Sequence, residues 1–162
     1  MRALGARTGH VDEADKAARS LQASIDTVKQ RVAGKRRPRT LLVFGREPGS
    51  LRNIYASAGR GFLHDMLVVA GGEDVLADID RESAQVSTEQ ILARQPEVIL
   101  ELNAASMLNA VDLKAVTDPW MTLTSVPAVR NKRVIVLNGP GLTVPGPRVL
   151  DGIEKMARAL HP

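Results

Sequence analysis

Residues 85–102, QVSTEQILARQPEVILEL, decide the fold class of this 162-residue chain. Ser87 and Gln90 have the spacing of a capping box, in which two side chains satisfy the free backbone groups at the start of a helix. The short helix that begins there must end before Pro96, because a residue that precedes proline is disfavoured in the helical region. The apolar run 98–102 is typical of a buried strand. A helix followed at once by a buried strand indicates an α/β fold.

Two further apolar runs, residues 40–44 and 133–137, predict strands on either side of this unit. Strands that alternate with helices form a mostly parallel sheet that is covered on both faces. The predicted fold class is therefore α/β, a three-layer Rossmann-like lobe. The remaining expectations are a loop over 45–60, helices over 61–70 and from Pro147 to about Leu160, a brief strand at 85–86, and helical turns and loops over 106–116 and 119–129.

A long amphipathic helix is predicted before the first strand, over residues 11–33. Its apolar positions recur at alternating steps of three and four, which places them in one stripe, and Gly34 is a natural stop. The spacing also fits a coiled-coil seam, but two alanines in the stripe favour a helix that lies on a domain surface. The expected domains are this helix, 1–36, and an α/β lobe, 37–162. The stripe consists of Val11, Ala14, Ala18, Leu21, Ile25, Val28 and Val32.

Composition argues against several kinds of chemistry. The chain has no cysteine, which excludes disulfides, thiolate metal sites and cysteine nucleophiles. His10, His64 and His161 are scattered and lack the spacing of metal ligands. No Walker loop, nucleophile elbow or acid–base pair is visible. The sequence therefore predicts a protein that is not an enzyme and that holds no metal through its own side chains.

Much of the net charge of +4 lies in a short basic run, Lys35, Arg36, Arg37 and Arg39. Such a run suits contact with nucleic acid. However, no aromatic stacking residues accompany it, and Pro38 fits a solvated turn between the long helix and the first strand. The solvated turn is the favoured interpretation, and a nucleic-acid-binding module is the alternative.

The sequence contains no candidate membrane segment. No stretch approaches the ~20 apolar residues of a membrane span. Residues 1–5 are not the start of a signal peptide, because the apolar segment that such a peptide requires is missing. The chain as written is therefore expected to stay in the cytoplasm.

Residues 86–93, VSTEQILA, followed by Pro96 and an apolar strand, resemble the C-terminal lobe of ABC-importer solute-binding proteins for cobalamin and ferric siderophores. Each matching motif is weak alone, but several in the family's order are specific, and together they cover essentially the whole chain. The other pieces are 4–9 (LGARTG), 42–46 (LVFGR), 48–50 (PGS), 61–63 (GFL), 70–75 (AGGEDV), Trp120, 126–134 (VPAVRNKRV) and 145–148 (PGPR).

The resemblance implies a protein that binds a ligand and neither makes nor breaks a covalent bond. Family members consist of two lobes joined by a rigid linking helix, here residues 1–36, and they hold the ligand in the cleft between the lobes. The implied ligand is a bulky metal chelate, namely a corrinoid, a ferric siderophore or haem, carried as cargo and not as a catalytic cofactor. Each lobe has a glutamate that docks onto arginines of the ABC permease, and Glu89 matches that of the C-terminal lobe.

The resemblance also bears on partners and location. It implies a periplasmic or lipid-anchored extracytoplasmic protein. The N-terminal lobe is absent from this sequence, so a homodimer or a separate partner lobe is expected to close the cleft. The alternative is a truncated lobe that folds but has no function.

The expected ligand site lies at loops beyond the carboxyl ends of the strands. Two positions depart from the cobalamin-binding relative. Ser83 stands where the relative has a tryptophan, and the loop 139–146 has no charged residue where the relative has an arginine and an aspartate. The candidate ligand contacts are Arg46, Asn53 and Tyr55 on the first loop, together with Ser83, and Leu142 on the last loop.

Overall fold

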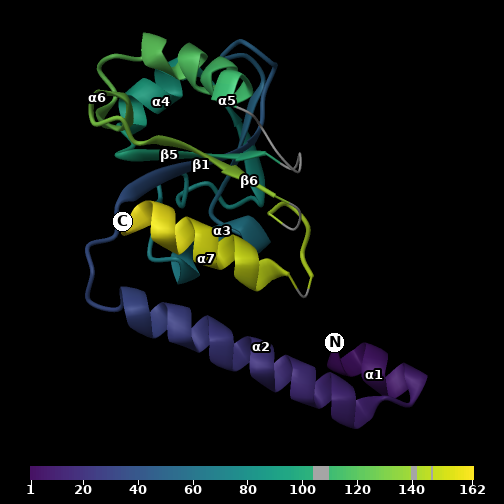
Figure 1. The fold of residues 1–162 in the computed structure, drawn as a ribbon. Helices are drawn as coiled ribbons and strands as arrows, with labels where there is room; N and C mark the ends of the chain where they lie inside the picture. Colours follow the sequence, from purple (N-terminus) through teal and green to yellow (C-terminus); the bar gives the residue numbers. More distant parts are fainter. Residues whose placement is uncertain (104–109, 140–141, 147) are drawn as a thin grey trace.

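The computed structural model describes residues 1–103, 110–139, 142–146 and 148–162 (Figure 1). A long helix leads into an α/β lobe whose strands lie between two layers of helices. The elements are α1 (Arg2–Thr8), α2 (Val11–Val32), β1 (Arg39–Gly45), β2 (Ile54–Ser57), α3 (Phe62–Val69), β3 (Glu73–Asp74), β4 (Ser83–Val86), α4 (Thr88–Arg94), β5 (Val98–Asn103), α5 (Ala110–Thr117), the 3₁₀ helix η1 (Asp118–Thr122), α6 (Pro127–Arg130), β6 (Val134–Asn138) and α7 (Val149–Leu160).

The sheet has the strand order β4-β2-β1-β5-β6, with β3 paired to β1. β1, β3, β5 and β6 run parallel, which confirms the predicted mostly parallel sheet, while β2 is antiparallel to both β1 and β4. The prediction that residues 45–60 form only a loop is wrong, because β2 lies within them. Ile54 and Ala56 are buried and Tyr55 is exposed, an alternation too short to read from the sequence.

Both faces of the sheet are covered, as predicted. Helices α2, α3 and α7 lie over one face, where Leu42 and Leu100 point into a core with Met156 (Figure 1). Helices α4, α6 and the 3₁₀ helix η1 cover the other face, where Leu41 and Ile99 pack against Trp120. Because consecutive residues of β1 and β5 point to opposite cores, these strands are mostly apolar, and Thr40 and Glu101 are their buried polar residues.

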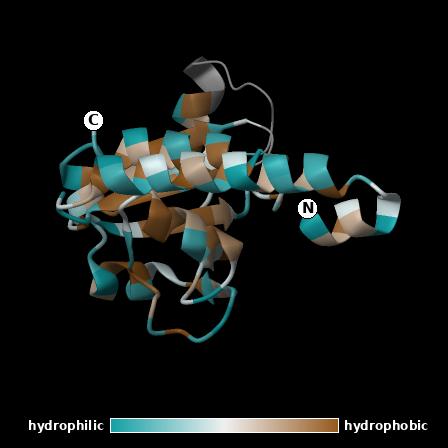
Figure 2. Cartoon of the chain, turned by 90° about the horizontal axis from the view of Figure 1, so that it is seen from below, coloured by the Kyte–Doolittle hydropathy of each residue, from teal (hydrophilic) through white to brown (hydrophobic). Residues whose placement is uncertain are grey.

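The predicted long helix is α2, but only part of it lies on the lobe. Ile25, Val28 and Val32 pack into the core with α7, whereas the N-terminal half of α2 projects beyond the lobe (Figure 2). Helix α1, which the sequence analysis did not anticipate, folds back on this half. We call α1 and residues 11–24 the extension.

A glycine makes the turn back possible. A side chain on Gly5 would have its Cβ only 2.3 Å from the Cβ of Ala14, so only a glycine lets the two helices approach this closely. Gly9 ends α1 in the left-handed conformation at φ 76°, which glycine adopts without strain. The small residues of the stripe and of α1 therefore serve a helix–helix contact.

Three residues of the basic run, Arg36, Arg37 and Arg39, pair with other groups of the lobe. Arg37 donates hydrogen bonds to the carbonyl oxygens of Val68 and Gly72 at 2.9 and 2.8 Å. Arg39 donates to the carbonyl oxygen of Arg94 at 2.7 Å, and Arg36 pairs with Glu97. These contacts support the interpretation of the run as a turn between α2 and β1.

Other local predictions agree with the structure. The capping box of α4 is present, with the Gln90 amide donating to the Ser87 Oγ at 3.3 Å and the Ser87 amide donating to the Gln90 Oε1 at 2.9 Å. The last helix is α7, but its predicted start at Pro147 lies outside the described residues. In the part of the chain that is described, no helix is both long and apolar enough to cross a membrane.

Candidate ligand-binding site

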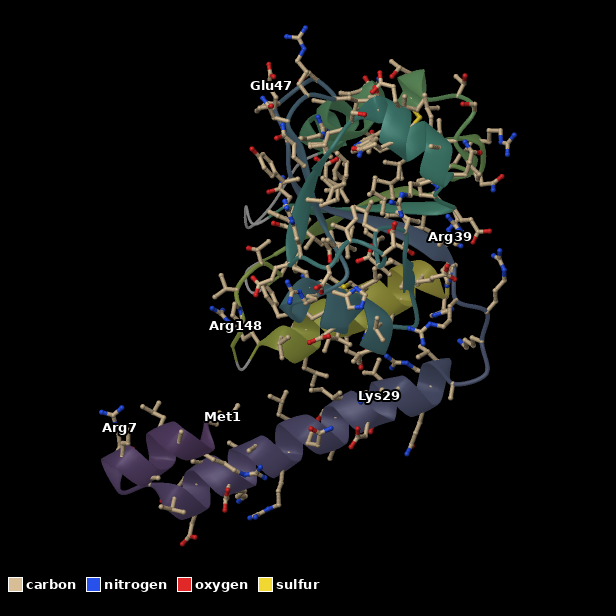
Figure 3. The ribbon with its side chains drawn as sticks, turned by 180° about the vertical axis from the view of Figure 1, so that it is seen from behind. Met1, Arg7, Lys29, Arg39, Glu47 and Arg148 are labelled. Atoms are coloured by element: carbon tan, nitrogen blue, oxygen red, sulfur yellow. The ribbon has the colours of Figure 1, made fainter. Side chains whose placement is uncertain are left out.

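The parallel strands β1, β5 and β6 end together at one side of the sheet, which we call the carboxyl edge. Asn103 and Asn138, the last residues of β5 and β6, are direct neighbours in the sheet. In Figure 3, Glu47 of the loop after β1 and Arg148 lie on this side, and Arg39 at the start of β1 lies on the opposite side. Met1 and Arg7 show that the extension projects on the side of the carboxyl edge (Figure 3).

The first loop of this edge, residues 46–53, is folded on itself. The Glu47 amide donates to the carbonyl of Arg52 at 3.0 Å, and the Ser50 amide donates to the carbonyl of Glu47 at 3.2 Å. Asn53 follows in the left-handed region at φ 49°, where asparagine is tolerated better than most residues. Its side-chain oxygen accepts a hydrogen bond from the Gln85 Nε2 at 3.1 Å, which ties the loop to β4.

Arg46 is directed into the protein. Its side chain is 4% exposed, and its Nε lies 3.0 Å from the Oε1 of Glu101, whose side chain is 12% exposed. The other oxygen of Glu101 accepts a hydrogen bond from the indole Nε1 of Trp120 at 2.7 Å. Nη1 of Arg46 donates to the carbonyl of Ser50 at 2.7 Å, and Nη2 donates to the carbonyl of Val116. The guanidinium thus makes its contacts inside the fold, whereas the sequence analysis expected it to face a ligand.

Tyr55 belongs to β2, although the sequence predicts a loop over residues 45–60. It is 44% exposed, and its ring lies against Phe44 with 6.5 Å between the ring centroids. Ser83 is exposed on the neighbouring strand β4, where it pairs with Ser57. Since Ile54 and Val86 pair nearest the carboxyl edge, Ser83 lies three positions further from that edge.

Leu142 lies in the core and not on the surface. Its side chain is 1% exposed and packs in the same cluster as Leu137 and Ile153. The prediction of a ligand contact through this side chain does not fit that position. The absence of charge in loop 139–146 does not by itself make the loop a ligand-facing surface, because an apolar side chain that can reach the core is stabilised by burial there.

An open groove of about 580 Å³ lies between the first loop and the start of α4. The exposed Glu89 is in the first turn of α4, between Thr88 and Gln90, which line the groove. A hydrogen bond with the Ser87 side chain and a backbone hydrogen bond lower the pKa of Glu89, so its carboxylate is an anion at neutral pH. The lining residues are Glu47, Leu51, Arg52, Asn53, Gln85, Val86, Ser87, Thr88 and Gln90.

Glu101 is not among the residues predicted from the sequence, and Trp120 is predicted only as part of a family motif and not as a partner of Glu101. A signal for Glu101 was present, because it is the one charged residue in the apolar strand 98–102. A buried carboxylate must have partners, so a cation had to face it. Nothing in the sequence indicated that the cation is Arg46, which is 55 positions away in the chain.

A second buried carboxylate, Asp74, lies at the opposite edge of the sheet, beside Thr40. It accepts hydrogen bonds from the Ser57 Oγ at 3.1 Å and the Leu76 amide at 2.9 Å, and His64 Nδ1 lies 3.2 Å away. Burial raises the pKa of Asp74. Among the described residues, no three histidine, aspartate or glutamate side chains are grouped as metal ligands would be.

The structure is thus an α/β lobe carried on a long helix that projects on the side of its carboxyl edge. Residues 1–140 match the family described as periplasmic binding protein, and the chain belongs to that family.

Named relatives agree with this assignment. The chain is 29% identical over 160 residues to the vitamin B12-binding protein of Salmonella typhi, covering 99% of this chain and 54% of the relative. An ABC transporter substrate-binding protein from Listeria monocytogenes EGD-e superposes with a TM-score of 0.83 at 27% identity, covering 99% of this chain and 61% of the other. The periplasmic vitamin B12-binding protein BtuF of Vibrio cholerae superposes with a TM-score of 0.71 at 26% identity, covering 90% and 52%. The chain spans about half the length of the curated relatives it matches.

Proposed function

We propose that this chain is the C-terminal lobe of the substrate-binding component of an ABC importer, and that its carboxyl edge binds one side of a bulky metal chelate. A corrinoid is the first candidate, because relatives at 26–29% identity are vitamin B12-binding proteins. A ferric siderophore and haem are the other candidates. The observation that carries the proposal is that the extension and the ligand-side loops lie on the same side of the sheet (Figure 3).

The extension supports a second lobe. A groove of about 510 Å³ lies between α1 and α2, is open to solvent, and is lined by both apolar and polar residues. Leu4 and Val11 of the extension are 68% and 51% exposed. A lobe that packed there would face the carboxyl edge and leave a cleft between the two. The lining residues are Met1, Arg2, Ala3, Ala18, Leu21, Gln22 and Ile25.

We divide the chain accordingly into a linking helix, residues 1–36, and a binding lobe, residues 37–162. The second lobe is either part of the same protein or a partner, and a homodimer is the remaining possibility. On this proposal the protein works outside the cytoplasm, as periplasmic binding proteins do. The proposal does not include nucleic acid as a partner, because Arg36, Arg37 and Arg39 each pair with a group of the protein itself.

Within the cleft, we propose Asn53 and Tyr55 as ligand contacts. Both are exposed, and the register of β2 keeps them at the carboxyl edge. Ser83 is a weaker candidate, because it lies further along the outermost strand. With serine in place of a large aromatic ring, this wall offers less stacking surface for a corrin.

A ligand screen tests this function. The chain is titrated separately with cyanocobalamin, haemin and a ferric hydroxamate, with the melting temperature and equilibrium dialysis as readouts. A ligand that binds only the native state raises the melting temperature, and Tyr55→Ala should reduce that rise. Unchanged melting with all three chelates, and none retained in dialysis, would contradict the proposal and favour the alternative, a folded lobe without function.

Docking to the permease is tested through Glu89. Glu89→Ala should leave chelate affinity unchanged within about twofold and weaken binding to the permease by about tenfold or more, since an arginine partner would lose its charge pair. Glu13→Ala, which removes one exposed carboxylate from α2, is the control. If chelate affinity falls while docking persists, the docking role is wrong.

A further inference from the structure

We infer that Arg46 is a positioning residue, which holds the first loop and helix α5 in one arrangement at the carboxyl edge through the buried Glu101. This inference rests on the proposed function only where it concerns ligand affinity. The structural part, that one guanidinium sets the loop, stands on the contacts of Arg46 alone.

The guanidinium of Arg46 reaches four separate parts of the chain. Nη1 donates to the carbonyl of Ser50 within the first loop, and Nη2 donates to the carbonyl of Val116 on α5. Nε faces the carboxylate of Glu101 on β5. The guanidinium carbon also lies 5.6 Å from the ring centroid of Trp120 in η1, which is cation–π range. The contact from Arg46 to Val116 is thus the one that joins the first loop to α5 among the hydrogen bonds of residues 46–53 in the described part of the chain.

The chemistry favours a geometric role. Arginine presents its N–H groups in a rigid planar fork, so contacts in several directions fix the position of the group as well as its charge. A buried ion pair gives little net stability over apolar residues of similar size, because both charges must leave water. Glu101 is itself held by the indole of Trp120 at 2.7 Å, so the carboxylate is a fixed anchor for the guanidinium.

This arrangement links the first loop to helix α5. The first loop carries Asn53 and leads into Tyr55. Helix α5 lies between β5 and β6 in the chain and packs against β6. If the loop moved relative to α5, the proposed contacts would lose their common geometry. Arg46 would therefore act on ligand affinity without touching the ligand.

Two variants distinguish an effect of Arg46 on the position of the first loop from an effect on the stability of the folded chain. In Arg46→Met with Glu101→Gln, both buried charges are replaced by neutral side chains, so no unpaired charge remains, and the amide oxygen at position 101 can still accept the hydrogen bond from the Trp120 indole. Arg46→Lys keeps the charge but lacks the fork, and it serves as the second variant if the double substitution does not fold. Arg158→Met makes the same kind of change at an exposed position of α7, outside the first loop and its groove, and is the matched control.

Three readouts are compared, namely melting temperature, amide hydrogen exchange in residues 47–53, and the Kd for cyanocobalamin. The double variant should melt within a few degrees of the parent. The amides of Glu47 and Ser50 should exchange about tenfold faster or more, because the loop loses its bonds to Arg46. The Kd should weaken by about tenfold, with Arg46→Lys intermediate and Arg158→Met unchanged.

The outcomes distinguish the two proposals. Unchanged exchange in residues 47–53 would overturn the positioning role, whatever the ligand result. Faster exchange with an unchanged Kd would overturn its effect on binding. If exchange is faster but even the parent binds no chelate, the role of Arg46 in setting the loop is supported and the proposed function fails.

Discussion

The α/β lobe and the extension contain apolar residues in regular patterns, yet only the lobe buries them on all sides. In the lobe, Leu100 of β5 is 0% exposed between α3 and α7. In the extension, Leu21 belongs to the same stripe as the buried Val28, but it lines an open groove. A repeating apolar pattern therefore identifies a helix face that is suited to packing. It does not show whether another part of the protein covers that face.

The largest expected effect separates the two regions by stability. Leu100→Ala should lower the free energy of unfolding by about 2–5 kcal/mol, because it opens a cavity in a fully buried core. Leu21→Ala should cost less than about 1 kcal/mol, because that side chain is only partly covered. Urea unfolding of both variants measures the difference. Equal losses would mean that the extension is packed as tightly as the lobe.

An intermediate effect concerns the contact that holds α1 on α2. Gly5→Val should separate the two helices, because there is no room for a Cβ beside Ala14. Amides of residues 2–8 should then exchange faster, while the free energy of unfolding of the lobe changes by less than about 1 kcal/mol. Ala6→Val adds the same side chain at an exposed position of α1 and should leave the contact in place. If Gly5→Val instead unfolds the lobe, the two regions are one cooperative unit.

The smallest effect concerns a pair on the lobe side of the comparison, where Arg36 of the α2–β1 connection meets Glu97 before β5. The hydrogen bond from Arg36 lowers the pKa of Glu97, and the backbone N–H of Arg39 adds to this at 3.0 Å. The folded state therefore binds fewer protons at this group than the unfolded state. Its stabilising contribution is present above the ordinary pKa of 4.5 and is lost as the pH falls through the lowered value.

Glu97→Gln should remove this dependence. At pH 7 the variant should be less stable than the parent by about 0.2–1 kcal/mol, since the pair is partly exposed, and the difference should shrink towards pH 3. Urea unfolding at a series of pH values measures it. Asp80→Asn, a change at a more exposed pair with Arg60, provides the control. A difference that grows as the pH falls would contradict the assigned sign.

Much of the fold could be predicted from local pattern. The capping box at Ser87, the apolar runs and the stripe of α2 each depend on residues close in sequence. The helices and strands that they form could therefore be predicted from the sequence. Strand β2 could not be read, because its four residues show alternation only once their neighbours β1 and β4 are in place. Helix α1 depends on the approach of Gly5 to Ala14 across a turn, which is equally invisible in the pattern.

The candidate site was less predictable than the fold. The sequence led to the carboxyl edge, and Asn53 and Tyr55 are exposed there. However, Arg46 and Leu142 are both buried, because a charged residue and an apolar residue in a loop can each find partners in the interior. Their ligand roles were inferred from loop position, which does not specify the direction of a side chain.

By itself, the sequence determined the fold class, the long helix and the membership of the periplasmic binding protein family, since these depend on periodicity and on motif order. Only the tertiary structure decided which residues act together. Arg46 and Glu101 are far apart in the chain, and they meet because β1 and β5 are adjacent parallel strands that end at the same edge. The same packing left half of the α2 stripe uncovered, because the lobe reaches only as far as Ile25.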